Sequence, residues 1–167
     1  MALFRRSPQL PGDVRERLGL SHHQPTLAIG RLTDGWAVAT STRLHAVVGD
    51  DVVVRDWSDV DGARLDTEGA TLTVTWVDGT RPTVMHIADD RAVGLPRVVH
   101  DRVQSSVVHT ERVVVPNGAT VRVAVRRSAD GHLLTQVIGT GDVDLSDPAT
   151  ASLVEAAEAR VAEATGQ

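Results

Sequence analysis

The chain contains no cysteine, lysine or tyrosine, and it has a single phenylalanine. The absence of cysteine excludes disulfides, thiol catalysis and thiolate metal sites. All 17 basic residues are arginine, so neither lysine point charges nor tyrosine stacking can form a binding surface. No apolar run approaches the roughly 20 residues that span a bilayer. Residues 1–6 lack the apolar stretch of a secretory signal, and together these absences predict a cytoplasmic location.

The remaining composition is that of an ordinary globular protein. Of the 167 residues, 41% are hydrophobic and 23% are charged, which is enough apolar material for a packed core. The net charge of −5 is unevenly distributed, because residues 26–90 carry five arginines against eleven acidic residues. Nucleic acids and anionic membranes favour the opposite sign. The charge therefore predicts no nucleic-acid partner and argues against membrane binding.

Residues 26–87 show short apolar runs separated by turn residues. In residues 71–76, Leu72, Val74 and Trp76 alternate with three threonines, the pattern of a half-buried strand. Asp78-Gly79 predicts a type I′ hairpin turn, and the short loops favour antiparallel hairpins over crossovers. The seven predicted strands are Thr26–Leu32, Trp36–Thr40, Arg43–Val48, Val52–Trp57, Val60–Leu65, Ala70–Val77 and Thr83–Ile87.

The period then changes to that of a helix. Val99, Val103 and Val107 recur at every fourth position, and Pro96 stands in the first turn, so the pattern predicts an amphipathic helix over Leu95–Val108. Its valines lower the intrinsic helix propensity, so packing must hold it.

The last third of the chain predicts three more strands and a second long helix. The strands are expected at Arg112–Pro116, Ala119–Arg127 and His132–Ile138. The helix is expected over Pro148–Ala164, with Asp147 as its N-cap, and its apolar stripe is expected to be Leu153, Ala157, Val161 and Ala164.

These elements suggest three parts of the chain. Residues 1–25 form a lead-in with a short helix. Residues 26–112 form the main domain, and residues 113–167 form a meander and helix packed on it.

Seven hairpin-ordered strands followed by one helix resemble the pleckstrin-homology-like (PH-like) superfold. Residues 43–60, RLHAVVGDDVVVRDWSDV, are similar to bacterial PH-like domains, and the whole chain resembles a group of uncharacterised actinobacterial proteins. The PH-like resemblance covers about half of the chain and implies a seven-stranded antiparallel barrel closed by a helix. With the three-stranded meander and C-terminal helix predicted after it, the expected fold is α+β, mainly β. The resemblance implies no activity. Phosphoinositide-binding members present a basic first hairpin, whereas here that hairpin offers only Arg31 beside Asp34, so the lipid role is not carried over.

No residue pattern in the sequence identifies a catalytic or metal-binding site. The seven histidines have no spacing that brings two of them together as metal ligands. Residues 141–147 begin like a calcium loop but lack its sharp-turn glycine and its bidentate glutamate. There is no G-x-S-x-G nucleophile elbow. We therefore predict no catalytic residue, no metal, no cofactor and no enzymatic activity.

The candidate binding residues are Arg122, Arg126, Arg127 and Trp57. The arginines form a basic stripe that could dock an acidic partner, or else a solvated edge that discourages strand pairing. Burial is the ordinary role of tryptophan, but Trp57 is expected to be partly exposed because it ends a strand.

Three functions remain open at this point. The first is a non-catalytic binding or scaffold module with a protein partner, which includes a second copy of the chain. The second is a peripheral membrane protein anchored by residues 3–6 with Arg15 and Arg17. The third is a small-ligand carrier or an enzyme with an unrecognised site, which would require a concave pocket.

Overall fold

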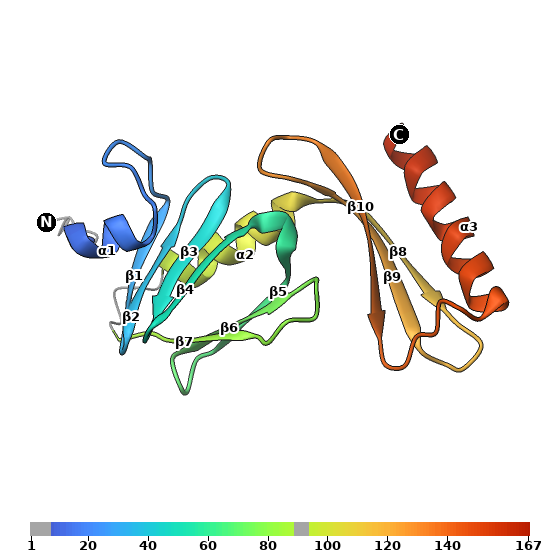
Figure 1. Ribbon diagram of the computed structural model, residues 1–167, viewed down its shortest axis with the longest axis horizontal. Coiled ribbons are helices and arrows are strands. Elements are labelled where there is room, and N and C mark those ends of the chain that lie inside the picture. The colour runs from blue at the N-terminus through green and yellow to red at the C-terminus, as the bar shows by residue number, and fades with distance from the viewer. Residues whose placement is uncertain (1–7, 89–93) are drawn as a thin grey trace, which may run out of the picture. The chain divides into compact units, whose positions relative to one another are not determined.

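The computed structural model describes residues 8–88 and 94–167 (Figure 1). These residues form an α+β fold that is mainly β, with three antiparallel sheets and few helices. The chain divides into two compact units, Met1–Gln104 and Ser105–Gln167. The proposed membrane-anchor residues 3–6 lie outside the described residues.

The first unit begins with a short helix and continues as two antiparallel sheets, ordered β1-β2-β3-β4 and β5-β6-β7. Each strand lies within two residues of its predicted position. The elements are α1 (Gly12–Arg17), β1 (Ala28–Leu32), β2 (Gly35–Ala39), β3 (Arg43–Val48), β4 (Asp51–Asp56), β5 (Val60–Asp66), β6 (Thr71–Trp76) and β7 (Thr83–His86).

Among the described residues, the backbone joins the two sheets of this unit at two places. The first is a single β-bridge between Leu32 and Ile87, beside which the Thr33 amide donates to the His86 carbonyl at 2.9 Å. The second is the 3-10 helix η1 (Trp57–Asp59), which connects β4 to β5. The sheets are therefore joined at the ends of strands rather than as one continuous ladder.

One hydrophobic core lies between these sheets and the helix α2 (Gly94–Ser106). The predicted alternation in β6 is confirmed, because Leu72, Val74 and Trp76 are buried and the threonines between them are partly exposed. Helix α2 contributes Leu95 and Val99, both fully buried, to the same core. Its valines are therefore held by packing, as their low helix propensity requires.

The predicted end of this helix was wrong. The helix stops at Ser106, and Val107 begins strand β8 (Val107–Val114) instead of extending the apolar stripe. The run Val107-Val108-His109-Thr110 is rich in β-branched residues, which favour a strand. The second unit therefore begins earlier than the boundary predicted after Arg112.

The Asp78-Gly79 turn also differs from the prediction. A type I′ turn needs positive φ at both central residues, but only Gly79 has one, at 71°, and Asp78 does not. The connection instead runs from Trp76 to Thr83. It is stabilised by the Asp78 carboxylate, which accepts a hydrogen bond from the Thr80 amide at 3.0 Å.

The second unit is one antiparallel sheet, ordered β10-β9-β8, with a helix against it. Its further elements are β9 (Thr120–Arg127), β10 (Leu133–Thr140) and α3 (Pro148–Thr165). Its core joins three buried valines of β9 to Val154, Ala157 and Val161 of α3. The predicted stripe was wrong at Leu153, which is 40% exposed because Val154 takes the buried position, and at Ala164, which is also exposed.

Candidate functional site

A groove of about 550 Å³ lies in the first unit beside strand β4. One wall is the end of β3 and most of β4, and the other is the connection from β6 to β7 with the start of β7. Its lining residues are Val48, Asp51, Val52, Val53, Val54, Arg55, Trp76, Thr80, Arg81, Pro82, Thr83 and Val84.

Arg55 connects the two walls of this groove. Its Nη1 lies 2.8 Å from Oδ2 of Asp78, and its Nη2 donates to Oγ1 of Thr80 at 3.3 Å. The guanidinium also lies over the ring of Trp76, 5.0 Å from the ring centroid. This cation–π contact adds to the two polar contacts, so one side chain of β4 holds the hairpin in place.

The carboxylate of Asp78 is fully ionised at neutral pH. Hydrogen bonds from Thr80, and then the bond from Arg55, lower the pKa of Asp78 from 3.8 to about 2. Both interactions favour the charged form. Asp78 therefore keeps the charge that attracts Arg55 over the whole neutral and mildly acidic range.

Strand β4 is the edge of its sheet, and two of its residues turn their backbone groups away from β3. The Thr40 amide bonds to the Arg43 carbonyl, so Arg43 faces β2 and its neighbour Leu44 faces β4. Leu44 is paired with Arg55. By the alternation of an antiparallel ladder, Val52 and Val54 point their N–H and C=O groups out of the sheet.

These outward groups have no partner within residues 8–88 and 94–167. The side chains of Val52 and Val54 are also open to solvent, since they are 46% and 41% exposed. Val84, which lines the groove from β7, is 42% exposed. The β3–β4 register has no bulge. Strand β4 thus lacks the bulges and prolines that usually protect a sheet edge.

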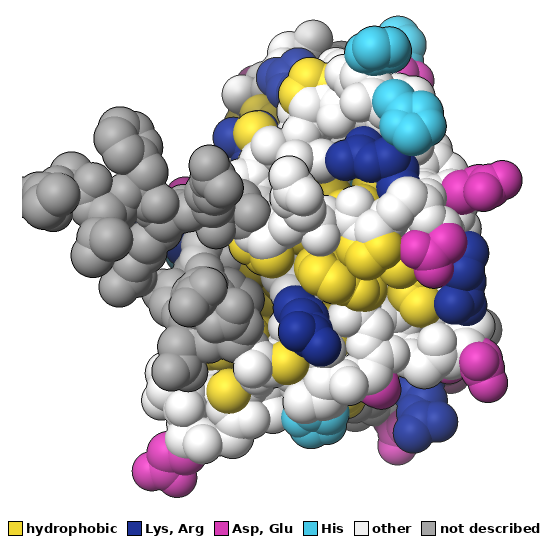
Figure 2. All heavy atoms as spheres, turned by 90° about the vertical axis from the view of Figure 1, so that its left-hand side faces the viewer, with side chains coloured by type: hydrophobic (Ala, Val, Ile, Leu, Met, Phe, Trp, Pro, Cys, Tyr) yellow, Lys and Arg dark blue, Asp and Glu magenta, His cyan; other side chains and the backbone are white. Residues whose placement is uncertain are grey.

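The N-terminal segment covers part of the sheet face that carries the side chains of Val52 and Val54. Leu18 and Leu20 pack against Val38 and Val47 in a separate small core. Val47 is paired with Val52 across the β3–β4 ladder, and paired residues share a face. The apolar face is therefore covered at β2 and β3 and uncovered at β4. Figure 2 shows the left-hand side of Figure 1, where α1 lies, and on it hydrophobic side chains reach the surface among arginines.

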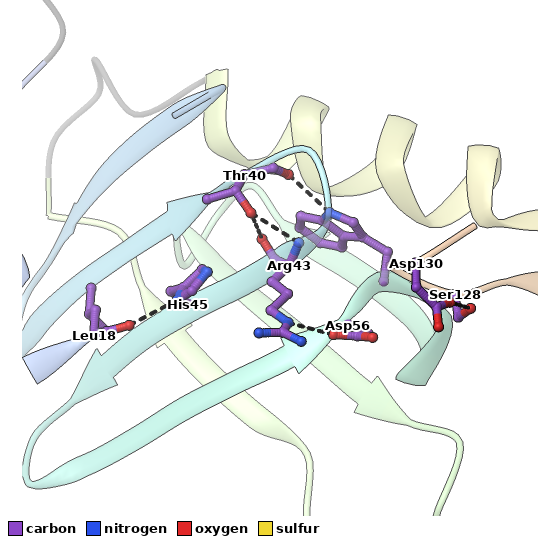
Figure 3. Close-up of polar contacts among 8 residues, drawn as sticks. Leu18, Thr40, Arg43, His45, Asp56, Ser128 and Asp130 are labelled. Atoms are coloured by element: carbon purple, nitrogen blue, oxygen red, sulfur yellow. Dashed lines mark hydrogen bonds and ion pairs between the residues drawn. The ribbon is translucent and has the colours of Figure 1, made fainter. Parts of the chain in front are cut away.

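His45 anchors the N-terminal segment to β3. Its Nδ1 lies 3.1 Å from the carbonyl oxygen of Leu18 (Figure 3). A carbonyl only accepts, so Nδ1 carries the proton. The side chain is 4% exposed, and its buried Nε2 has no hydrogen-bond partner among the described residues. Burial lowers the pKa of His45 below its usual value, and the charge of Arg43 adds to this, whereas the bond to Leu18 opposes it.

The predicted site residues do not form one exposed surface. Trp57 is only 4% exposed, and its Nε1 donates to the Thr40 carbonyl at 3.0 Å, so its expected partial exposure was wrong. The indole needs a buried acceptor, and the turn between β2 and β3 supplies one. Arg126 is 3% exposed, Arg122 is partly buried, and Arg127 is exposed and donates to the Gly131 carbonyl. A role for Arg122 and Arg127 in binding stays a prediction.

Within the described ranges there is no group of three His, Asp or Glu side chains placed to hold a metal ion. Nor does any helix in these ranges combine the length and hydropathy needed to cross a bilayer. The groove itself was missed from the sequence. Its valines were visible as a strand, but which strand forms the edge of a sheet depends on the fold.

Comparison with known proteins found no matching family model, curated protein or solved structure. The PH-like resemblance and the resemblance to actinobacterial proteins therefore stay predictions.

Proposed function

We propose that this chain is a non-catalytic protein-interaction module whose first unit is a PH-like barrel closed by α2. The element order supports the PH-like interpretation, since seven strands precede the helix. The burial of Leu95 and Val99 in the core between the sheets supports the closing role of α2. In this proposal β4 and the adjoining groove bind an extended segment of a protein partner.

The observation that carries this proposal is the open edge of β4. The N–H and C=O groups of Val52 and Val54 point out of the sheet beside a groove large enough for several residues of extended chain. An added strand gains affinity from main-chain hydrogen bonds and specificity from the pockets beside them. Here Val84 and Trp76 contribute to the apolar lining of the groove opposite β4, which suits apolar side chains at alternate positions of the partner.

A library of random heptapeptides displayed on phage tests this function. We expect selection of peptides with alternating apolar residues, and we expect Val54→Pro to abolish their binding because proline removes the outward N–H. The matched control is Val54→Thr, which keeps that N–H and should keep most of the binding. A library from which no peptide sensitive to Val54→Pro emerges would refute the proposal.

The groove volume also supports a small-ligand carrier as a second candidate. About 550 Å³ lies within the range of small-molecule sites, roughly 300–1,000 Å³. A small ligand would use the groove walls without pairing along the strand. Its binding should therefore survive Val54→Pro and be lost in Val84→Asp, with a thermal-shift screen of a metabolite collection as the assay. If no compound in that screen raises the melting temperature of the wild-type chain, this candidate fails.

A further inference from the structure

The sequence of the exposed edge is complementary to itself when it is read in the opposite direction. Strand β4 begins Asp51-Val52-Val53-Val54-Arg55, with an acid at one end, a base at the other and three valines between them. Two copies of such a strand placed antiparallel bring each acid opposite a base. We propose that a second copy of this chain occupies the β4 edge, in a two-fold symmetric dimer with Asp51 opposite Arg55 of the partner subunit. This inference rests on the proposed function and names its partner.

The backbone supports this register. With Val53 on the two-fold axis, Val52 lies opposite Val54 of the partner subunit, and both residues point their backbone groups outward from their own sheets. Each such pair exchanges two hydrogen bonds, and the symmetry repeats the pair. A shift by one residue would set outward groups against residues that already face β3, so that register is excluded.

The side chains select among the registers that the backbone allows. A shift of the axis to Val52 brings Asp50 opposite Val54 of the partner subunit, and a shift to Val54 brings Asp56 opposite Val52 of the partner subunit. Only the register centred on Val53 pairs valine with valine and acid with base at both ends. Opposite charges and β-branched pairs directly across a ladder are both stabilising.

The charged groups at the ends of the strand are available for these contacts. Asp51 is exposed and makes no ion pair among the described residues. Arg55 uses Nη1 and Nη2 toward the hairpin, which leaves further donors of its five N–H groups, and its side chain is 32% exposed. In the same register Asp56 faces Asp50 of the partner subunit, but Arg43 neutralises Asp56 through an ion pair of 2.6 Å.

The size of the contact sets the expected strength. One pair of short strands buries far less surface than a standard protein interface, which is about 1,600 Å². We therefore expect a weak dimer, with a dissociation constant of roughly 0.1 mM. Sedimentation velocity of the full chain, from about 10 µM to about 1 mM at low and at moderate salt, covers this range.

Four variants test the edge and the register. Val54→Pro should abolish the dimer, and Val54→Thr should retain it. Asp51→Arg places like charges at both ends and should raise the dissociation constant about tenfold. The fourth variant combines Arg55→Asp with Asp78→Asn, so that the new acid does not adjoin an acid of the hairpin. It should dimerise poorly alone, but an equimolar mixture with Asp51→Arg should form a heterodimer, because both acid–base pairs are then restored.

Each outcome decides the inference. A chain that stays monomeric to about 1 mM overturns it, as does a dimer that survives Val54→Pro. A mixture of the two charge variants that stays monomeric overturns the register. If Val54→Pro fails to fold by circular dichroism, the charge variants and their mixture still decide. If the chain is monomeric but phage peptides bind in a manner sensitive to Val54→Pro, the inference fails while the proposed function stands.

Discussion

The contact between His45 and Leu18 predicts that the N-terminal segment loosens in acid. The Nδ1 proton of His45 is committed to the Leu18 carbonyl, and the buried Nε2 has no partner among the described residues. Protonation would therefore place a charge on a nitrogen that no acceptor stabilises. The charge of Arg43 does not compensate, because it disfavours the protonated ring.

The sign and size of this pH effect on segment detachment follow from proton linkage. When the segment detaches, His45 is solvated and titrates near its ordinary pKa of about 6.5, whereas burial holds the pKa below that value in the packed state. The detached state then binds more protons. The packed state is fully stable above about pH 6.5 and loses stability as the pH falls toward the lower pKa. One proton changes the free energy of detachment by at most about 1.4 kcal/mol per pH unit.

Amide hydrogen exchange measures this local opening. The Leu18 amide bonds to the Val14 carbonyl and the Leu20 amide to the Arg15 carbonyl, both at 3.0 Å, so their protection reports the packed segment. Protection should fall as the pH drops below about 6.5 in the wild type and stay flat in His45→Asn, whose amide can still donate to Leu18. Equal pH dependence in both proteins would refute the role of His45.

Three further substitutions, two of them with a control variant, test the packing and the helix cap. Leu95→Ala should lower the free energy of unfolding by about 2–5 kcal/mol, because Leu95 is fully buried; Leu145→Ala, at a side chain 53% exposed, should change it by less than about 0.5 kcal/mol in the same urea titration. Asp147→Ala should lower the melting temperature of α3, because the Asp147 carboxylate caps this helix by accepting a hydrogen bond from the Thr150 amide at 2.9 Å. Asp147→Asn should retain most of the cap, and an unchanged melting temperature in both variants would contradict the capping role of Asp147. Gly35→Ala should prevent folding of the first sheet, since its Cβ would lie 1.8 Å from the backbone oxygen of Val47; a normal circular dichroism spectrum would refute this.

Local sequence pattern predicted the elements where one periodicity dominates. The alternation around Val74 and the cap at Asp147 both depend on residues close in sequence, and both appear in the structure. The end of α2 was missed because helix periodicity and β propensity compete at Val107.

The candidate site was less predictable because it depends on contacts between distant residues. Trp57 is buried through an acceptor, the Thr40 carbonyl, that lies 17 positions away in the sequence. Arg55 reaches Asp78 across 23 positions. The open edge follows from the strand order, in which β4 has a partner on one side only among the described strands. Nothing in the pattern of the valines themselves distinguishes an edge strand from a central one.

The stacking of Arg55 on Trp76 has a spectroscopic consequence. The chain has no tyrosine and one phenylalanine, so its three tryptophans dominate its ultraviolet fluorescence. With Trp36 and Trp57 replaced by phenylalanine, the only emitting indole would be Trp76, which is 6% exposed and lies under a guanidinium at the groove wall. Its emission maximum and its quenching by iodide would then report whether the groove is empty, occupied by a ligand or widened, without an attached dye.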